Sequence, residues 1–496
     1  MKRLHPIMCA GTGSDVGKSI ITTAFCRIFR QDGYNPAPFK AQNMALNSFA
    51  TPDGFEIGRA QAVQAEAAAV PCHTDMNPLL LKPQSDHTSQ VVLNGKPIGN
   101  RDAYDYFRKE GREELRAEVN AAFDRLAARY NPIVMEGAGS IAEINLRDTD
   151  LVNMPMAKHA RADVILVGDI DRGGVFASVY GSLMLLEPQE RKLIKGIIIN
   201  KFRGDIRLFE PGVKMLEQLC GIPVLGVLPY YKDIHIEEED SVSLASKSLN
   251  AEQGMINIAF VLLRHISNFT DFNVIERDTR VHLFYSNNPD ELSKADIIIL
   301  PGSKSTIDDM HELWRNGAAQ AILKAHRNGS SVLGICGGYQ MMGQRILDPH
   351  HVEGDVEMLP GLGLLPTITE MGTEKVTRQT KFSLYGRSEI MGGYEIHMGT
   401  TVQIDGSTAL PLNKLADGNT DGYMGSPTCM GTYIHGILDN QQFIDFLLEP
   451  HIQKTKSLET FDYHKFKEQQ YDKLAEHVRK YLNIPLVYDI LTRDYD

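Results

Sequence analysis

The chain has 496 residues, of which 43% are hydrophobic and 23% are charged. This length is too great for a single hydrophobic core, so we expect two large domains. The formal net charge of −12 argues against a nucleic acid or an anionic membrane surface as the main partner, because either would need a basic protein face.

The cysteines and the apolar runs indicate a cytoplasmic protein. The six cysteines form no Cys-x-x-Cys pair and no His-Cys group, so the sequence suggests neither a disulfide framework nor a zinc site. The first thirteen residues contain too few apolar side chains for a signal peptide, and no later apolar run approaches membrane-spanning length. We therefore expect no membrane partner.

The chain opens with a strand, a glycine loop and a helix. An apolar run over 6–10 leads into GTGSDVGKS (11–19), and helical periodicity follows over 20–30. In such a loop the backbone N–H groups cradle phosphates, the lysine reaches the terminal phosphates and the serine hydroxyl binds Mg²⁺. Because Thr12 replaces the usual first glycine, the loop resembles that of dethiobiotin-synthetase-like ATPases. The expected ATP-binding residues are Thr12, Gly13, Gly17, Lys18 and Ser19.

A second strand, over 37–40, ends in the polar segment KAQNMALNS. Ligands of open α/β sheets bind where parallel strands end. The candidates for the γ-phosphate and acceptor region are therefore Lys40, Gln42, Asn43 and Asn47, and a polar loop without a catalytic role is the open alternative. Helices are expected over 57–70 and 104–130.

Further strands over 132–139, 163–171, 196–200 and 223–229 alternate with helices. This alternation predicts a mostly parallel, doubly wound α/β sheet, which we assign to a domain over 1–232. Glu136 ends one of these strands, in the place where P-loop enzymes keep a carboxylate associated with Mg²⁺. Asn200 ends another, and it resembles the base-reading asparagine of this ATPase class.

Residues 233–254 lose apolar periodicity and gain acidic, serine and asparagine residues, which indicates a linker. A new α/β pattern follows, with strands expected over 256–263, 281–285 and 295–302 and a helix over 306–328. We assign a second doubly wound domain to 255–445. A helical tail is expected over 446–496, with an amphipathic helix over 461–482.

The segment SVLGICGGYQMMG (331–343) places Cys336 between a strand and a helix. Its glycines, Gly334, Gly337 and Gly338, allow positive φ and close backbone approach, and the helix N-terminus favours a thiolate. A buried, inert cysteine is the alternative interpretation.

A nucleophilic cysteine needs a base and an oxyanion site. His435, in GTYIHGILDN, is the candidate base, and Gly302 and Gly337 are the candidate oxyanion donors.

Three segments of the second half, LPGSKST, GICGGYQMMG and TYIHG, resemble the class I glutamine amidotransferase domain. Together with GTGSDVGKS, KAQNMALN, NPLLLKP, EGAGS, GDIDRGGVFAS and INKFRGD, they make the chain resemble the cobyric acid synthase family of the cobalamin pathway, over about residues 5–445. The resemblance implies that Cys336 attacks the glutamine carboxamide, that His435 is its base and that Gln340 contacts the bound glutamine.

One position departs from the wider triad class. Ile437 stands where that class has a glutamate, two residues after the histidine. His435 must therefore be oriented by another group or act in a dyad, and Glu395 in GYEIHMG is the candidate substitute.

The resemblance implies amidation of the b, d, e and g carboxylates of a corrinoid, adenosylcobyrinic acid a,c-diamide, to give adenosylcobyric acid. ATP would activate each carboxylate as an acyl phosphate, with Mg²⁺ at Ser19 and Glu136, and glutamine would supply ammonia. Corrin cobalt would enter only as part of the substrate. Two alternatives stay open: a cobyrinic acid a,c-diamide synthase, and a non-catalytic P-loop regulatory protein. A homo-oligomer is also left open.

Overall fold

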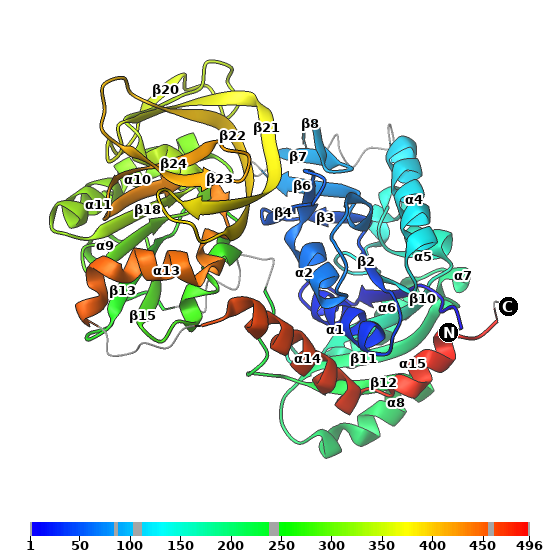
Figure 1. Cartoon of the computed structure of the whole chain (residues 1–496). Helices are drawn as coiled ribbons and strands as arrows, with labels where there is room; N and C mark the ends of the chain where they lie inside the picture. The colour runs from blue at the N-terminus through cyan, green and yellow to red at the C-terminus, as the bar shows by residue number, and fades with distance from the viewer. Residues whose placement is uncertain (1, 84–87, 103–111, 238–247, 455–460, 495–496) are drawn as a thin grey trace. The chain divides into compact units, whose positions relative to one another are not determined.

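The computed structural model describes residues 2–83, 88–102, 112–237, 248–454 and 461–494. The chain divides into two compact units, each of mixed α/β structure (Figure 1). The predicted α/β class with parallel sheets is confirmed in both. Unit 1 comprises Met1–Ala45, Ile57–Glu237 and Lys465–Asp496, and unit 2 comprises Leu46–Glu56 and Glu238–His464. The expected boundaries therefore need two changes, because residues 46–56 belong to unit 2 and the expected tail is divided between the units.

Unit 1 is built on a six-stranded parallel sheet. Most of its strand residues are buried, as expected for a parallel sheet that is covered on both faces. In spatial order its strands are β12 (Val224–Pro229), β11 (Ile194–Phe202), β10 (Asp163–Asp169), β1 (Ile7–Gly11), β9 (Ile133–Glu136) and β2 (Ala37–Phe39).

The direction of each crossover explains which face its helix covers. The crossover from β1 to β2 runs one way along the sheet and the later crossovers run the other way, so right-handed connections place α1 on one face and the later helices on the opposite face. The helices are α1 (Lys18–Gln31) on the first face, and α4 (Arg112–Arg129), α5 (Met154–Ala160), α6 (Val175–Leu185) and α8 (Glu210–Cys220) on the second.

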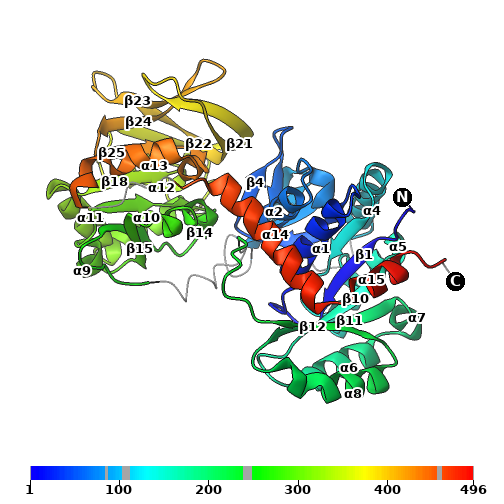
Figure 2. The same ribbon diagram turned by 60° about the horizontal axis from the view of Figure 1, so that its bottom comes forward.

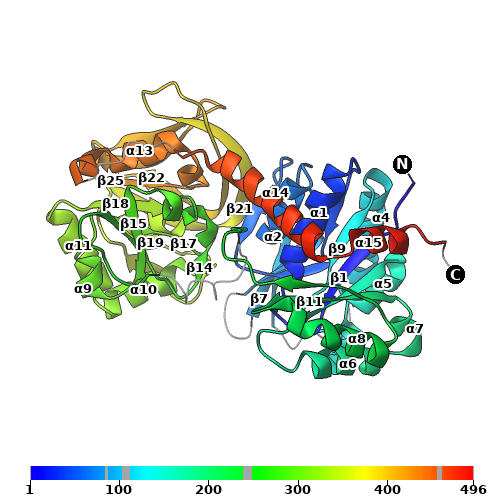
Figure 3. The same ribbon diagram turned by 90° about the horizontal axis from the view of Figure 1, so that it is seen from below.

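The C-terminal helices cover the part of the first face that α1 leaves open. They are α14 (Tyr463–Tyr481) and α15 (Ile484–Leu491), and both lie beside α1 and β12 (Figures 2 and 3). Leu474, Val478 and Ile490 share one buried cluster with Phe25 of α1 and Leu225 of β12. These helices are therefore part of the core of unit 1.

Unit 1 also carries a small second sheet and shorter helices. Residues 103–111, where the first part of the helix expected over 104–130 falls, and residues 238–247 of the expected linker lie outside the described residues. The additional elements are α2 (Arg59–Ala67), α7 (Pro188–Arg191), β3 (Gln42–Met44), β6 (Leu79–Pro83), β7 (Thr88–Leu93) and β8 (Lys96–Asp102).

Unit 2 contains a mixed sheet whose parallel part holds the cysteine turn. The parallel strands are, in spatial order, β15 (Val281–Ser286), β13 (Ile256–Val261), β16 (Ile297–Leu300), β18 (Ser331–Ile335) and β25 (Cys429–Thr432). The sheet continues through β24 (Thr420–Ser426), β23 (Leu410–Leu415), β21 (Thr367–Leu384), β19 (Arg345–Leu347) and β20 (Met358–Pro360), while β22 (Met391–Gln403) pairs with β21 and with β26 (Ile434–His435).

The helix expected over 306–328 is divided into two. Gly317 adopts a φ of +84° and ends the helical geometry, so α10 and α11 are separate helices. The remaining elements of unit 2 are α9 (Pro289–Leu292), α10 (Thr306–Arg315), α11 (Ala318–Arg327), α12 (Gly337–Met342), α13 (Gln441–Leu448), β4 (Ser48–Ala50), β14 (Ile266–Ser267) and β17 (Gly302–Ser303). Within the described ranges, no helix is both long and apolar enough to cross a membrane.

Candidate functional site

The glycine loop of unit 1 folds around the amino group of Lys18. Its Nζ donates hydrogen bonds to the carbonyl oxygens of Gly13 at 2.8 Å and Gly139 at 3.0 Å. Gly17 has a φ of +96°, and a Cβ atom there would lie 2.1 Å from Nδ2 of Asn200, so only glycine fits. The loop N–H of Thr12 is bonded to the carbonyl of Val167 at 3.0 Å. A buried cation at the centre of a glycine loop is the arrangement expected of an anion-binding loop.

Glu136, at the end of β9, collects three donors. Its carboxylate accepts hydrogen bonds from Ser19 at 2.9 Å, Lys40 at 2.8 Å and Gln64 at 2.6 Å. Burial raises the pKa of Glu136, but the Lys40 ammonium and the three hydrogen bonds outweigh this effect and lower the pKa below its ordinary value. The structure therefore brings Ser19, Lys40 and an ionised Glu136 together beside the glycine loop.

This group of donors fits a magnesium ion. Ser19 and Glu136 offer a hydroxyl and a carboxylate oxygen, the ligand types that Mg²⁺ prefers. The buried Oε1 of Gln64 has no hydrogen-bond partner among the described residues, so it is a further oxygen at the site. No cluster of three His, Cys, Asp or Glu residues in the described chain could hold a metal alone. Water and phosphate oxygens would therefore complete the coordination.

Sequence reasoning missed Gln64. It lies on α2, where Gln61 and Gln64 are three residues apart among small apolar residues, and both are fully buried. Residues with this spacing share one helix face. Two buried amides on a face that otherwise packs closely were the available signal.

The other predicted residues of this half have different surroundings: Asn200 contacts the glycine loop, whereas Asn47 belongs to unit 2. Asn200 Nδ2 donates to the carbonyl of Val16 at 2.9 Å and so supports the loop backbone. Asn43 Nδ2 donates to Gln61 at 3.1 Å, and Gln42 begins β3. Asn47 accepts a hydrogen bond from the N–H of Phe269 in unit 2. Lys40 and Asn47 therefore belong to different units.

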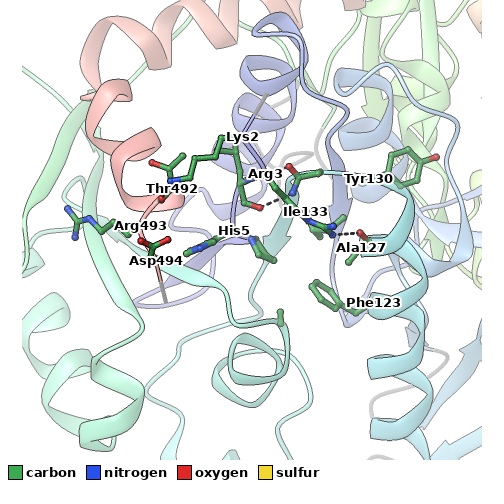
Figure 4. Close-up of a pocket in the computed structure, with 14 residues that line it drawn as sticks. Lys2, Arg3, His5, Phe123, Ala127, Tyr130, Ile133, Thr492, Arg493 and Asp494 are labelled. Atoms are coloured by element: carbon green, nitrogen blue, oxygen red, sulfur yellow. Dashed lines mark hydrogen bonds between the residues drawn. The ribbon is translucent and has the colours of Figure 1, made fainter. Parts of the chain in front are cut away.

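A cavity of about 480 Å³ lies at the opposite edge of the same sheet (Figure 4). Its lining includes His5 and Asn131, which precede β1 and β9, together with Phe123 of α4. His5 Nδ1 lies 3.0 Å from Asp163, and Arg3 donates to the carbonyl of Ala127 at 2.9 Å. Because parallel sheets bind ligands at the carboxyl ends of their strands, this cavity at the amino ends is not the nucleotide site.

In unit 2, Cys336 sits on a strained turn between β18 and α12. Its φ is +52°, whereas the expectation assigned positive φ to the neighbouring glycines. The glycines are needed for close approach, because a Cβ atom on Gly338 would lie 2.0 Å from the Leu300 oxygen and one on Gly337 would lie 2.8 Å from the Ser303 nitrogen. The turn resembles the strand-to-helix elbow that exposes a nucleophile.

His435 is held by Asp271, a residue that the sequence did not indicate. Its Nδ1 lies 2.6 Å from Oδ2 of Asp271, and the other carboxylate oxygen accepts the N–H of Gly436 at 3.1 Å. Burial lowers the pKa of His435, but the Asp271 carboxylate and the nearby Cys336 sulfur outweigh it and raise the pKa to about 10. The structure thus brings Cys336, His435 and Asp271 together in the arrangement of nucleophile, base and acid that a catalytic triad has.

The expected substitute, Glu395, has other partners. It accepts hydrogen bonds from Arg378 at 3.0 Å and lies 3.6 Å from Nε2 of His397. The suggestion that Glu395 orients His435 was therefore wrong, since Asp271 binds the imidazole. Asp271 stands 164 residues before His435, so no local spacing could connect them, although an acid between Phe269 and Phe272 was a weak sign of burial.

The remaining predicted residues surround this triad. A Cβ atom on Gly302 would lie 3.2 Å from Cε1 of His435, so the LPG loop borders the imidazole. Gln340 accepts a hydrogen bond from Thr306 at 3.1 Å and donates to the carbonyl of Met398 at 2.8 Å. Its amide therefore links α12 to α10 and β22.

Comparison with known proteins agrees with both halves of this description. Residues 7–244 match the family model "CobQ/CobB/MinD/ParA nucleotide binding domain", and residues 257–443 match "CobB/CobQ-like glutamine amidotransferase domain". A relative from Bacteroides fragilis, named cobyric acid synthase, is 74% identical over 99% of both chains. A relative with the same name from Phocaeicola vulgatus is 72% identical over 99% of both chains. Another, from Parabacteroides distasonis, is 57% identical over 98% of this chain and 99% of the relative. The chain therefore belongs to the cobyric acid synthase family of glutamine-dependent amidoligases.

Proposed function

We propose that the chain converts adenosylcobyrinic acid a,c-diamide to adenosylcobyric acid by amidating its b, d, e and g carboxylates with ATP and glutamine. The observation that carries this proposal is the presence, in one chain, of a glycine loop beside Glu136 and of a Cys336–His435–Asp271 triad. The first can hold a nucleotide and the second can release ammonia. The shared name of the full-length relatives supports the corrinoid substrate.

The triad supplies the ammonia in this scheme. The Cys336 thiolate attacks the glutamine carboxamide carbon, and N–H groups near Gly302 and Gly337 stabilise the resulting oxyanion. The intermediate collapses when the His435 imidazolium gives its proton to the departing nitrogen, which leaves as ammonia. Water, deprotonated by His435, then hydrolyses the thioester and frees glutamate. Gln340 keeps α12 and β22 in place around the bound glutamine, and its contact with glutamine itself remains a proposal.

The P-loop unit supplies the activation, because ammonia does not displace oxygen from a carboxylate. A substrate carboxylate oxygen attacks the γ-phosphorus of ATP, ADP leaves, and an acyl phosphate forms. Ammonia then attacks the carbonyl carbon and phosphate leaves. Lys18 and the loop N–H groups bind the phosphates, while Lys40 lies beside Glu136 where the transferred group would pass. A bound Mg²⁺, held by Ser19 and Glu136, would neutralise phosphate charge.

The remaining candidates of unit 1 would contact the nucleotide or the acceptor carboxylate. Gly13 would contact phosphate oxygens through its loop N–H, whereas Thr12, whose N–H is bonded to the Val167 carbonyl, would contact them through its hydroxyl. Asn200 would face the base while it supports Val16. Gln42 and Asn43 are kept as candidates for the acceptor side of the site. Asn47 is not kept in that role, because its hydrogen bond to Phe269 places it in unit 2.

The direct test is a mass-spectrometric assay with the purified full chain, the a,c-diamide, ATP, Mg²⁺ and glutamine. We expect a product that carries all remaining amides, and we expect Cys336→Ala to abolish the glutamine-dependent reaction while free ammonia still supports it. Cys429→Ala is the matched control, because burial raises the pKa of this thiol to about 12 and makes it unreactive. This control should keep glutamine use.

Two outcomes would contradict the proposal. Normal glutamine hydrolysis by the Cys336→Ala variant would show that Cys336 is not the nucleophile. A wild-type chain that accepts cobyrinic acid and amidates only its a and c carboxylates would instead identify the sister activity, the a,c-diamide synthase.

A further inference from the structure

A short segment from the first half of the sequence is built into unit 2. Residues Leu46–Glu56 follow Lys40 by only a few positions, yet they belong to the unit that contains Cys336 and His435. They form β4, whose partner strand β5 (Glu56–Gly58) brings the chain back to unit 1. This insertion interrupts the domain that we expected over 1–232, and its contacts in unit 2 indicate what it does there.

The beginning of the segment holds the turn that carries Asp271. Asn47 Oδ1 accepts a hydrogen bond from the N–H of Phe269 at 3.1 Å, and the N–H of Ser48 donates to Oδ1 of Asn268 at 2.9 Å. Asn47 and Ser48 are fully buried, and Asn268 has a φ of +53°. The η5 turn (Phe269–Phe272) follows at once. Two hydrogen bonds thus fix the chain immediately before the carboxylate that binds His435.

The middle of the segment reaches the ring face of the same histidine through Tyr394. The ring of Phe49 lies 4.6 Å from the ring of Tyr394, and the ring of Tyr394 stacks on His435 at 5.3 Å with an interplanar angle of 20°. Ala50 is buried in one cluster with Tyr394 and Ile396. The carbonyl of Ile396 accepts a hydrogen bond from the Cys336 thiol at 3.5 Å.

The end of the segment is anchored within unit 2. The buried Glu56 accepts a hydrogen bond from Ser48 at 2.7 Å and forms an ion pair with Lys375 of β21. Gln379, also on β21, donates to the carbonyl of Ala50 at 2.9 Å. A segment held by buried charge and hydrogen bonds at both ends can transmit position to the groups between them.

We propose that residues 47–50 position the catalytic histidine of the glutaminase, through the Asp271 turn on one side and through Tyr394 on the other. This role rests on the proposed function of Cys336 and His435. Asn47 and Phe49 are positioning residues, since they act on His435 through Asp271 and Tyr394. The part of the chain that supplies Lys40 to the ATP site therefore also completes the ammonia-releasing site.

The test uses the full chain with Asn47→Ala, Asn268→Gly and Phe49→Leu. Asn268→Gly removes the side chain that binds Ser48 but keeps a residue that adopts positive φ without strain. For each variant, glutamine hydrolysis and ammonia-dependent amidation are measured separately. Displacing a catalytic group by about 1 Å costs about 10²-fold in rate, so we expect kcat for glutamine to fall about 10- to 100-fold with little change in KM. Ammonia-dependent turnover should stay at the wild-type level.

Pro52→Ala, in the exposed turn of the same segment, is the matched control and should hydrolyse glutamine normally. Wild-type glutamine turnover in all three variants would overturn the positioning role. An equal loss of glutamine-dependent and ammonia-dependent activity would also overturn it, because that result indicates a general folding defect. Failure of the proposed function is distinguishable, since it would appear as normal glutamine hydrolysis by Cys336→Ala.

Discussion

The charge of His435 is set by its buried neighbours. Burial alone would lower the pKa of the imidazole, whereas Asp271 and Cys336 raise it to about 10. Below that pH the imidazolium is the main form of His435. In the proposed mechanism a protonated His435 gives its proton to the departing nitrogen, so Asp271 would both orient the ring and keep it charged.

Asp271→Asn tests this assignment. Without the carboxylate, the pKa of His435 should fall, so the imidazolium proton is lost at a lower pH. We expect the alkaline limb of the pH profile of kcat/KM for glutamine to move to lower pH, and the rate at its maximum to fall about 10²-fold or more. Asp439→Asn, an exposed carboxylate four residues after His435, is the control. A profile that keeps its alkaline limb would contradict the role of Asp271.

Local motifs predicted the residues whose role depends on their neighbours in sequence. Lys18 and Ser19 begin the helix that follows a glycine loop, Cys336 lies on a glycine-flanked turn, and Glu136 ends an apolar strand. Asp271 could not be predicted in the same way, because the contact that defines its role joins residues 164 positions apart. Several predicted roles, such as glutamine binding by Gln340, remain predictions.

At the scale of elements, the cysteine turn depends on how closely α12 approaches β16. A methyl group on Gly338 would lie 2.0 Å from the backbone oxygen of Leu300, which cannot rotate away. In Gly338→Ala the helix must therefore move off the strand and carry Cys336 with it. We expect a free energy of unfolding lower by about 1–3 kcal/mol, the usual cost of overpacking, and a large loss of glutamine hydrolysis.

The control for this change is Gly392→Ala. Gly392 has an ordinary φ, and a Cβ atom there would meet nothing within 4 Å. Chemical denaturation and a glutaminase assay on both variants give the comparison. If Gly338→Ala retained wild-type stability and activity, the close approach of α12 and β16 would not be required.

Strands buried in parallel sheets were the elements that the sequence predicted best, since short continuous apolar runs such as those of β10, β16 and β18 are typical of strands covered on both faces. The long hairpin of β21 and β22 was not predicted. It runs over 367–403 with charged and polar residues throughout, because much of it is exposed, so its periodicity is weak. The break between α10 and α11 was also missed, since one glycine is often tolerated within a helix.

At the scale of the whole molecule, each unit is built from stretches that lie far apart in the sequence. Residues 46–56 complete unit 2, and residues 465–496 complete unit 1. An interpretation based on continuous segments predicted two α/β domains correctly but left open whether the C-terminal helix packs on a domain or on a second subunit. The buried cluster supplies the missing reason, because α1 and α2 leave part of their face of the sheet for the C-terminal helices to cover.

The stability of unit 1 should therefore depend on α14. Leu474 is fully buried against the core that contains α1, so Leu474→Ala leaves a cavity and should lower the free energy of unfolding of unit 1 by about 2–5 kcal/mol. Glu476→Ala, exposed on the same helix, should change it by less than about 0.5 kcal/mol.

Denaturation can be followed through ATP binding for unit 1 and through glutamine hydrolysis for unit 2. Because α14 packs its buried face on the sheet of unit 1, the Leu474 variant should lose ATP binding at a lower denaturant concentration than the wild type, whereas the glutamine transition should hardly move. A shift confined to the glutamine transition would mean that α14 stabilises the other unit.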